Sequence, residues 1–281
     1  MLAERCGGVI VNADSAQLYR DLKIVSAAPS NEDLSRAEHR LYGVLDGAAS
    51  CSAADWAAMA RCEIEEVHAH DKMAVLVGGT GLYLRTLING IAPIPPIDAE
   101  VRREVRAADV EANRARLAEL DADAAARLNR ADTMRIARAL EVVLSTGKTL
   151  GDWQNHRQGG IGGAITLRPL VLLPPRDWLY ARCDERFANM IEHCATEEVA
   201  ALLKRDLDPK LPVMRAIGVR EIRAYLSGEI DREQMIAQGQ QATRNYAKRQ
   251  YTWFAHQPPP EWPRMTEYAY EAALELLATS A

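Results

Sequence analysis

The sequence predicts an α/β protein that combines a parallel sheet with a large proportion of helix. Two short apolar runs, 9–12 and 73–77, end in small or polar residues. Buried parallel strands show this pattern, an apolar run followed by small or polar residues, where they place functional groups at the carboxyl edge of a sheet. A third observation is the stretch 99–146, which is rich in Ala, Arg and Glu and has no strand signal. At 281 residues, the chain can bury a core as one large domain or two modest ones.

Strands and helices alternate along the first 90 residues. Gly7 stands where a glycine ends a first helix. Ser52 followed by Asp55 forms a capping box, which opens a helix that reaches about residue 68. The expected strands are 9–12, 39–45 and 73–77, and the loop 78–81 leads into a helix over 82–89.

Prolines at positions 93, 95 and 96 mark a domain boundary. Beyond them we expect a small, wholly helical insertion. Its last helix covers about 134–145, is capped by Asp132 or Thr133 and ends at Gly147. Residues 165–173 should rejoin the sheet, and helices should follow over 178–254 and 267–277. The predicted domains are 1–94, 95–164 and 165–281.

Composition excludes several classes of protein. No apolar run has the length of a membrane span, and the start lacks the pattern of a signal peptide, so we expect a cytoplasmic protein. The five cysteines are odd in number and form no C-x-x-C pair. They therefore predict buried free thiols rather than a disulfide framework or a zinc site.

Charge is unevenly distributed. The net charge of −5 argues against indiscriminate coating of nucleic acid. Between residues 202 and 252, however, ten basic residues face six acidic ones. Such a local basic surface fits selective contact with one folded RNA. A solvated helical face explains the charge equally well.

Three groups of residues could carry chemistry. Asp14 follows a buried strand and could act as a general base or as a helix N-cap. The glycines of 78–81 could let the backbone approach a phosphate or an RNA, or could serve only a tight turn. Arg182 and Arg186 share one helix face, where they could clamp a diphosphate or pair with nearby acids.

The stretches 215–220 and 248–255 mix cations with apolar and aromatic residues. Cations hold RNA phosphates, and aromatic rings stack on unpaired bases. The aromatic side chains of Tyr251 and Trp253 could equally belong to the core.

Taken together and in order, these segments resemble the bacterial tRNA dimethylallyltransferases. The matching pieces are 12–15, 77–83, 135–142 with 146–148, 182–187, 214–220, 242–244 and 247–253. The resemblance covers nearly the whole chain. It implies a P-loop kinase-like core whose helical insertion grips the anticodon stem-loop of tRNA, in a monomer that requires dimethylallyl diphosphate and Mg²⁺.

The resemblance also implies residue roles. Asp14 would accept a proton from the exocyclic amine of a flipped adenine, and Ser15, Ala16 and Gln17 would line the base pocket. Arg182 or Arg186 would stabilise the departing diphosphate. The remaining residues in contact with RNA would be Thr80, Arg102, Met134, Arg135, Ile136, Ala137, Arg138, Arg215, Ala216, Ile217, Gly218, Val219, Arg220, Lys248, Arg249, Gln250, Tyr251, Thr252, Trp253, Phe254 and Ala255.

The sequence departs from the family pattern in several places. Ala28 stands where a basic residue is usual, Met134 replaces a Gln and Val219 replaces a Tyr. No G-x-x-x-x-G-K-[ST] phosphate loop occurs in the chain, and the family's first strand and P-loop would precede Met1. We therefore expect either a start site assigned too late or a truncated, inactive product. A version extended upstream should then bind dimethylallyl diphosphate better.

Two other functions remain open at this stage. One is an isopentenyltransferase that acts on free adenine nucleotides, and the other is a tRNA-binding remnant without catalysis. The helical insertion and the cationic stretches favour tRNA over a mononucleotide, because a mononucleotide needs neither.

Overall fold

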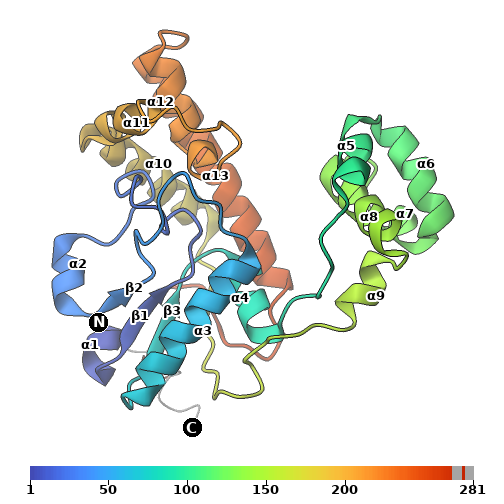
Figure 1. The fold of residues 1–281 in the computed structure, drawn as a ribbon. Helices are drawn as coiled ribbons and strands as arrows, with labels where there is room; N and C mark the ends of the chain where they lie inside the picture. The colour runs from blue at the N-terminus through green and yellow to red at the C-terminus, as the bar shows by residue number, and fades with distance from the viewer. Residues whose placement is uncertain (268–273, 276–281) are drawn as a thin grey trace. The chain divides into compact units, whose positions relative to one another are not determined.

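In the computed structural model, which describes residues 1–267 and 274–275, the chain folds as two compact units (Figure 1). The sheet unit comprises 1–85 and 165–281, and the helical unit comprises 86–164. Residues 86–94 join the helical unit because their backbone is bonded to its return segment. Ile91 and Gln158 exchange two backbone hydrogen bonds, of 3.0 and 2.9 Å. The division therefore falls before the prolines that suggested a boundary after residue 94.

The sheet unit contains a three-stranded parallel sheet with β1 at its centre. The strands β1 (Val9–Asn12), β2 (His39–Arg40) and β3 (Ala74–Val77) lie in the order β2-β1-β3. The register pairs Val9 with Ala74 and Asn12 with Val77. The three strands were predicted, but β2 stops after two residues. Leu41 has a φ of 62°, a left-handed conformation that turns the chain out of the strand.

The prediction that residues 165–173 rejoin this sheet is wrong. Only β4 (Val171–Leu172) forms, and it pairs in parallel with β5 (Arg264–Met265) as a separate two-stranded sheet. The backbone N–H groups of Val171 and Leu173 donate to the carbonyls of Pro263 and Met265. Pro174 directly after this segment has no N–H to extend a ladder, so the strand stays short.

Helix α3 (Ala53–Ala69) packs on the sheet through Trp56, Ile64 and Val67 (Figure 1). Both bonds of the predicted capping box are present at its start. The indole of Trp56 is fully buried and donates a 2.9 Å hydrogen bond to the carbonyl of Asn12. It also stacks on Tyr83 at 4.7 Å between ring centroids. This contact fixes the start of α4 (Gly81–Asn89) near the carboxyl end of β1.

Two short helices lie near the start of the chain. The first, α1 (Leu2–Cys6), ends at Gly7 with a φ of 61°, as predicted. The second, α2 (Asn31–Arg36), was not predicted, although Ser30 and Asp33 form a capping box at its start.

The predicted helical region 178–254 is confirmed as several separate helices. These are α10 (Arg176–Glu192), α11 (Ala195–Leu203), the 3₁₀ turn η1 (Val213–Arg215), α12 (Val219–Leu226) and α13 (Arg232–His256). Helices α10 and α13 pack closely against each other. Gly239 makes this approach possible, because a Cβ there would overlap the ring of Phe187.

The helical unit is all-helical, as predicted. Its helices are α5 (Ala99–Ala107), α6 (Val110–Leu120), α7 (Ala122–Arg127), α8 (Thr133–Thr146) and α9 (Leu150–Gln154). Asp132 caps α8, and Gly147 ends it with a φ of 70°. Apolar side chains of α5 to α8 form a small core of their own. Glu141 is buried at its edge, where Arg106 neutralises it across 2.5 Å.

Three further expectations have different outcomes. All five cysteines are free, but Cys6, Cys62 and Cys194 are exposed, so the prediction of buried thiols holds only for Cys183. Over the described part of the chain, no helix combines the length and apolar character needed to cross a membrane. The helix expected over 267–277 lies almost wholly outside the described residues.

The contact at Gly239 makes a stability prediction. Gly239→Ala should lower the free energy of unfolding by about 1–3 kcal/mol, because the new methyl group must displace the buried ring of Phe187. Gly151→Ala is the matched control. A Cβ at Gly151 would lie 3.6 Å from Thr149 Oγ1, an ordinary contact, so the change should be neutral or stabilising by up to about 1 kcal/mol. Urea unfolding monitored by circular dichroism measures both. Equal stability of the two variants would contradict the packing described here.

Candidate functional site

Asp14 lies two residues beyond β1, at the carboxyl edge of the sheet, and is half-buried. One carboxylate oxygen, Oδ1, accepts a 2.8 Å hydrogen bond from the backbone N–H of Ala16. No donor from the described residues is bonded to Oδ2. One oxygen therefore fixes the side chain on its own loop, and the other is free to accept a proton.

The buried side chain of Asn12 fixes the backbone around Asp14. Its Oδ1 accepts from the N–H of Asp14 at 2.8 Å, and its Nδ2 donates to the carbonyl of Asp14 at 3.0 Å. The same Nδ2 donates to the carbonyl of Leu41 at 2.9 Å. Asn12 is fully buried, and its bond to Leu41 is buried with it. The loop that carries Asp14 is thus tied to the segment that follows β2.

The glycine loop after β3 contacts the chain's own backbone. A Cβ at Gly78 would overlap the backbone of Ala13. Just beyond, the N–H of Thr80 donates to the carbonyl of Ala13 at 3.1 Å, and Thr80 Oγ1 accepts from the N–H of Ser15 at 3.0 Å. The glycines therefore serve a close approach between two strand ends. The result is that Asp14, Ser15 and Thr80, which the resemblance groups together, are neighbours in space.

Helix α13 covers this pair of loops. Gln250 Nε2 donates to the carbonyl of Gly79 at 3.1 Å. The ring of Trp253 occupies the space that a side chain at Gly81 would need. The stretch 248–255 therefore lies against the loop 78–81. Its aromatic residues are half-buried, and the guanidinium of Arg176 lies 4.9 Å above the ring of Tyr251.

Three tyrosines lie close enough to Asp14 to feel its charge, and sequence analysis assigned none of them to the site. Burial raises the pKa of Tyr42 to about 12, and the negative charge of Asp14 contributes to that shift. Burial is also the main cause that raises the pKa of Tyr246 and of Tyr83, with Asp14 again contributing. Because all three phenols remain protonated at neutral pH, they can donate hydrogen bonds and do not add negative charge.

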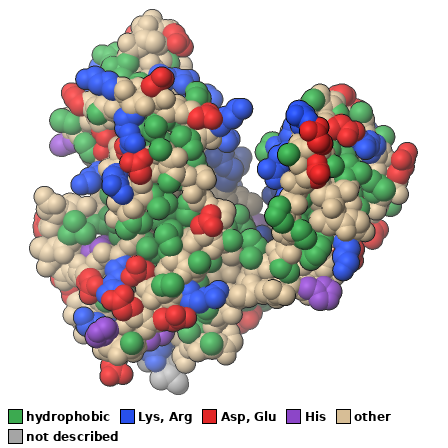
Figure 2. All heavy atoms as spheres, viewed as in Figure 1, with side chains coloured by type: hydrophobic (Ala, Val, Ile, Leu, Met, Phe, Trp, Pro, Cys, Tyr) green, Lys and Arg blue, Asp and Glu red, His purple; other side chains and the backbone are tan. Residues whose placement is uncertain are grey.

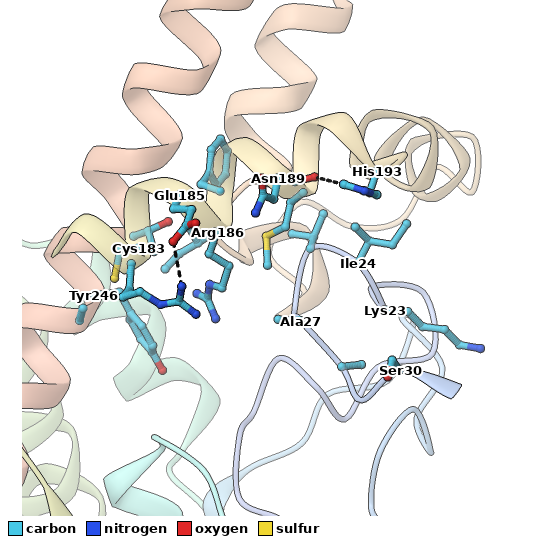
Figure 3. A pocket seen from close by; sticks show the side chains of 18 of the residues that line it. Lys23, Ile24, Ala27, Ser30, Cys183, Glu185, Arg186, Asn189, His193 and Tyr246 are labelled. Atoms are coloured by element: carbon cyan, nitrogen blue, oxygen red, sulfur yellow. Dashed lines mark hydrogen bonds and ion pairs between the residues drawn. The ribbon is translucent and has the colours of Figure 1, made fainter. Parts of the chain in front are cut away.

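A cavity of about 750 Å³ lies beside this cluster, within the sheet unit. It is formed by the loop 23–31 and by helices α10 and α13, as Figure 3 shows. Lys23, Arg182 and Arg186 supply positive charge to its lining and Glu185 supplies negative charge, whereas Ile24 and Met190 are apolar. Tyr246 belongs both to this lining and to the surroundings of Asp14. The cavity is therefore suited to a ligand with an anionic end and an apolar end.

The two arginines of α10 differ in their partners. Arg182 is 62% exposed and pairs with Glu185 at 2.8 Å. Arg186 has no ion-pair partner in the described part of the chain, and its side chain extends into the cavity (Figure 3). Of the two candidates for binding a diphosphate, only Arg186 offers an uncompensated guanidinium.

The stretch 215–220 is partly internal. Gly218 has a φ of 96°. A Cβ added at this position would lie 3.0 Å from the side chain of Val25 and 3.4 Å from that of Phe187, so both side chains pack closely against the glycine. Val219 is buried, so its side chain is not available to a ligand. Arg215 is exposed, and Arg220 is 80% exposed. Of the other two residues in the stretch, Ala216 is half-buried and Ile217 lines the cavity.

The remaining candidates belong to the helical unit. Arg102, Met134 and Arg135 are exposed and Arg138 is partly exposed, whereas Ile136 and Ala137 are buried in the core of the unit. Figure 2 shows Lys and Arg side chains gathered along one edge of this unit. Side-chain contact with a ligand is therefore open to Arg102, Met134, Arg135 and Arg138.

Mg²⁺ takes oxygen ligands, which the protein could supply as clustered carboxylates. Among residues 1–267 and 274–275, no group of three or more His, Cys, Asp or Glu side chains could hold a metal ion. These residues therefore provide no cage for the ion that the resemblance implies.

Comparisons with known proteins agree on one family. The IPP transferase family model matches residues 17–257. A tRNA dimethylallyltransferase of Erythrobacter litoralis is 60% identical over 263 residues, which are 94% of this chain and 83% of the relative. One from Novosphingobium aromaticivorans is 59% identical and covered to 92% on both sides.

Solved structures give the same result. The full-length tRNA isopentenylpyrophosphate transferase of Bacillus halodurans is similar with a TM-score of 0.69 and 30% identity, over 100% of this chain and 91% of that one. A eukaryotic dimethylallyltransferase acting on tRNA has a TM-score of 0.75 and 25% identity, over 90% of this chain and 64% of that one. These likenesses confirm the predicted fold class and the resemblance stated from the sequence.

The hydroxyl of Thr80 gives a prediction that needs no assay of activity. Thr80→Val keeps the shape of the side chain but leaves the N–H of Ser15 without its partner. The free energy of unfolding should therefore fall by about 1–2 kcal/mol. Thr80→Ser, which keeps the hydroxyl, should lie within about 0.5 kcal/mol of the wild type. Urea denaturation compares the three proteins. If the valine and serine variants are equally stable, the bond does not hold the two loops together.

Proposed function

The chain belongs to the IPP transferase family, and we propose that it transfers a dimethylallyl group from dimethylallyl diphosphate to N6 of the adenine 3′ of the anticodon in tRNA. The observation that carries this proposal is the position of Asp14. A half-buried carboxylate with one free oxygen lies beside a cavity that contains an unpaired guanidinium. The names of the relatives, all tRNA dimethylallyltransferases, support the same reaction.

In the proposed reaction, N6 of the adenine attacks C1 of the dimethylallyl group. The new C–N bond forms as the C1–O bond to the diphosphate breaks, and the bonding electrons leave with the diphosphate. The proton of N6 passes to Oδ2 of Asp14. A base that must reach the extruded adenine is well placed at the end of a strand, since the sheet holds it rigidly.

The cavity would bind the second substrate. Its apolar lining suits the five-carbon dimethylallyl chain, and Arg186 would meet the negative charge that develops on the diphosphate. Tyr246 lines the cavity and lies within the electrostatic reach of Asp14. Its protonated phenol therefore stands where the two reactants would meet. Mg²⁺, if it is required, would be bound by the diphosphate, whose oxygens are ligands that the ion prefers.

Exposed cationic side chains support tRNA as the acceptor. Arg102, Arg135 and Arg138 in the helical unit and Arg215, Arg220 and Lys248 in the sheet unit are available to phosphates. A free nucleotide has too few phosphates to engage either set in full. Binding should therefore weaken steeply as the salt concentration rises, because each phosphate contact releases a counterion.

Removal of the proposed base provides the first test. Asp14→Asn should lower kcat by at least 100-fold, which is typical for loss of a general base, and should leave the affinity for RNA nearly unchanged. The measurement is transfer of radioactive label from dimethylallyl diphosphate to an anticodon stem-loop, with AMP as the competing acceptor. If the wild-type protein transfers label to AMP alone, the assignment of tRNA as acceptor is contradicted. If the wild-type protein retains the stem-loop on a filter but transfers no label, it is a tRNA-binding protein without catalysis.

The two arginines of α10 provide the second test. Arg186→Ala should raise the KM for dimethylallyl diphosphate and lower kcat, together by about 100-fold in kcat/KM, since it removes the unpaired charge from the cavity. Arg182→Ala is the matched control on the same face of the helix. Because Arg182 is exposed and already paired with Glu185, its loss should cost less than about threefold. Equal effects would show that the ion pair does not distinguish the two residues.

A further inference from the structure

The wall loop, residues 23–28, lies between the cavity and the segment that carries Asp14. It contains no regular helix or strand. Two backbone hydrogen bonds close turns within it. The N–H of Ala27 donates to the carbonyl of Ile24, and the N–H of Ala28 donates to the carbonyl of Lys23. Ala27 has a φ of 53°, a left-handed conformation that an alanine rarely adopts. Contacts from outside the loop must therefore hold it in this shape.

Glu198, on α11, supplies the first of these contacts. Its carboxylate accepts from the N–H of Ile24 at 2.9 Å to Oε1 and 3.1 Å to Oε2, and from the N–H of Val25 at 2.9 Å. Two successive N–H groups that point to one spot form an anion-binding nest. Here the anion is a side chain of the protein that lies more than 170 residues away in the sequence.

Gln17 holds the same loop from the Asp14 side. Its Nε2 donates to the carbonyls of Ser26 at 3.1 Å and Ala27 at 2.8 Å. Gln17 lies three residues after Asp14, and the resemblance suggested that it lines the base pocket. Its amide nitrogen is committed to the wall loop. The loop is therefore gripped by a carboxylate on its N–H groups and by an amide on its carbonyls.

A third contact links the wall loop to the stretch 215–220. The side chain of Val25 fills the space beside Gly218, where a Cβ would lie 3.0 Å from it. The wall loop thus touches the cavity, the segment 14–17 and one of the stretches that the resemblance assigns to RNA contact.

We infer that Glu198 is a positioning residue that couples the cavity to the catalytic segment through the wall loop. With the carboxylate in place, the bonded N–H groups of Ile24 and Val25 keep the loop in position as a wall of the cavity. The bonds from Gln17 to the same loop then fix the position of residues 14–17. Without the carboxylate, the strained turn at Ala27 can relax, and both the cavity lining and the setting of Asp14 loosen together. Only the kinetic part of this inference rests on the proposed function.

The first measurement is hydrogen exchange of the free protein, which needs no activity. Glu198→Gln keeps the size of the side chain but replaces one acceptor oxygen by a donor. Exchange at Ile24 and Val25 should become at least tenfold faster, and exchange at Ala16, whose N–H is bonded to Asp14, should also rise. Glu197→Gln is the control, because this exposed neighbour undergoes the same change of charge. Unchanged exchange at Ala16 in Glu198→Gln would overturn the coupling.

The second measurement is steady-state kinetics. Glu198→Gln should raise the KM for dimethylallyl diphosphate about tenfold and lower kcat, while the KM for an anticodon stem-loop stays within twofold. Glu198→Asp, which keeps the charge, should recover part of the loss and also serves if the glutamine variant does not fold. Equal kinetics of Glu198→Gln and Glu197→Gln would reduce Glu198 to a structural role. If the wild-type protein transfers no prenyl group, the proposed function fails, and the exchange data alone decide the coupling.

Discussion

The candidate site depends on one buried amide, the side chain of Asn12. It bonds to the N–H and the carbonyl of Asp14 and to the carbonyl of Leu41. Asn12 is fully buried, and a polar group in such a position costs about 1–3 kcal/mol if left unpaired. No apolar side chain could replace these bonds. The amide therefore dictates how the chain leaves β1 and where the carboxylate of Asp14 points. The indole of Trp56 donates a further bond to the backbone carbonyl of Asn12, so the end of β1 is fixed from within the core.

Features with a local cause were predictable from the sequence. The strand 9–12, the capping box of Ser52 and Asp55 and the glycine stop of α8 each arise from a few consecutive residues, and each is present. Features that need distant partners were not predictable. Residues 171–172 pair with a strand more than 90 residues later. The three tyrosines around Asp14 come from three separate segments, and nothing in their local sequence marks them as members of one cluster.

The structure separates alternatives that the sequence left open. Asp14 was expected as a general base or a helix N-cap, but no helix begins between β1 and α2. Its Oδ1 accepts from the N–H of Ala16 in a turn, which leaves Oδ2 for the proposed role as a base. The glycines after β3 were either a tight turn or a ligand cradle. They allow contact with Ala13 and with α13, and that contact positions Thr80 beside Ser15. The two arginines of α10 were expected either to bind a diphosphate or to pair with nearby acids. Arg182 pairs with Glu185, and Arg186 does not.

The predicted RNA-contacting stretches combine exposed and internal positions, and this bears on the residues where the sequence departs from its family. Val219 stands where a tyrosine is usual, and its side chain is buried. A tyrosine there would have to bury its larger ring or turn outward, so the substitution alters packing around Gly218 more directly than it alters any contact with RNA. Met134 is different, because it is 62% exposed and accepts a contact from Arg106 at 3.4 Å. A thioether is a weaker acceptor than the usual amide. Of the two departures, Met134 is therefore the one whose side chain is accessible to a ligand.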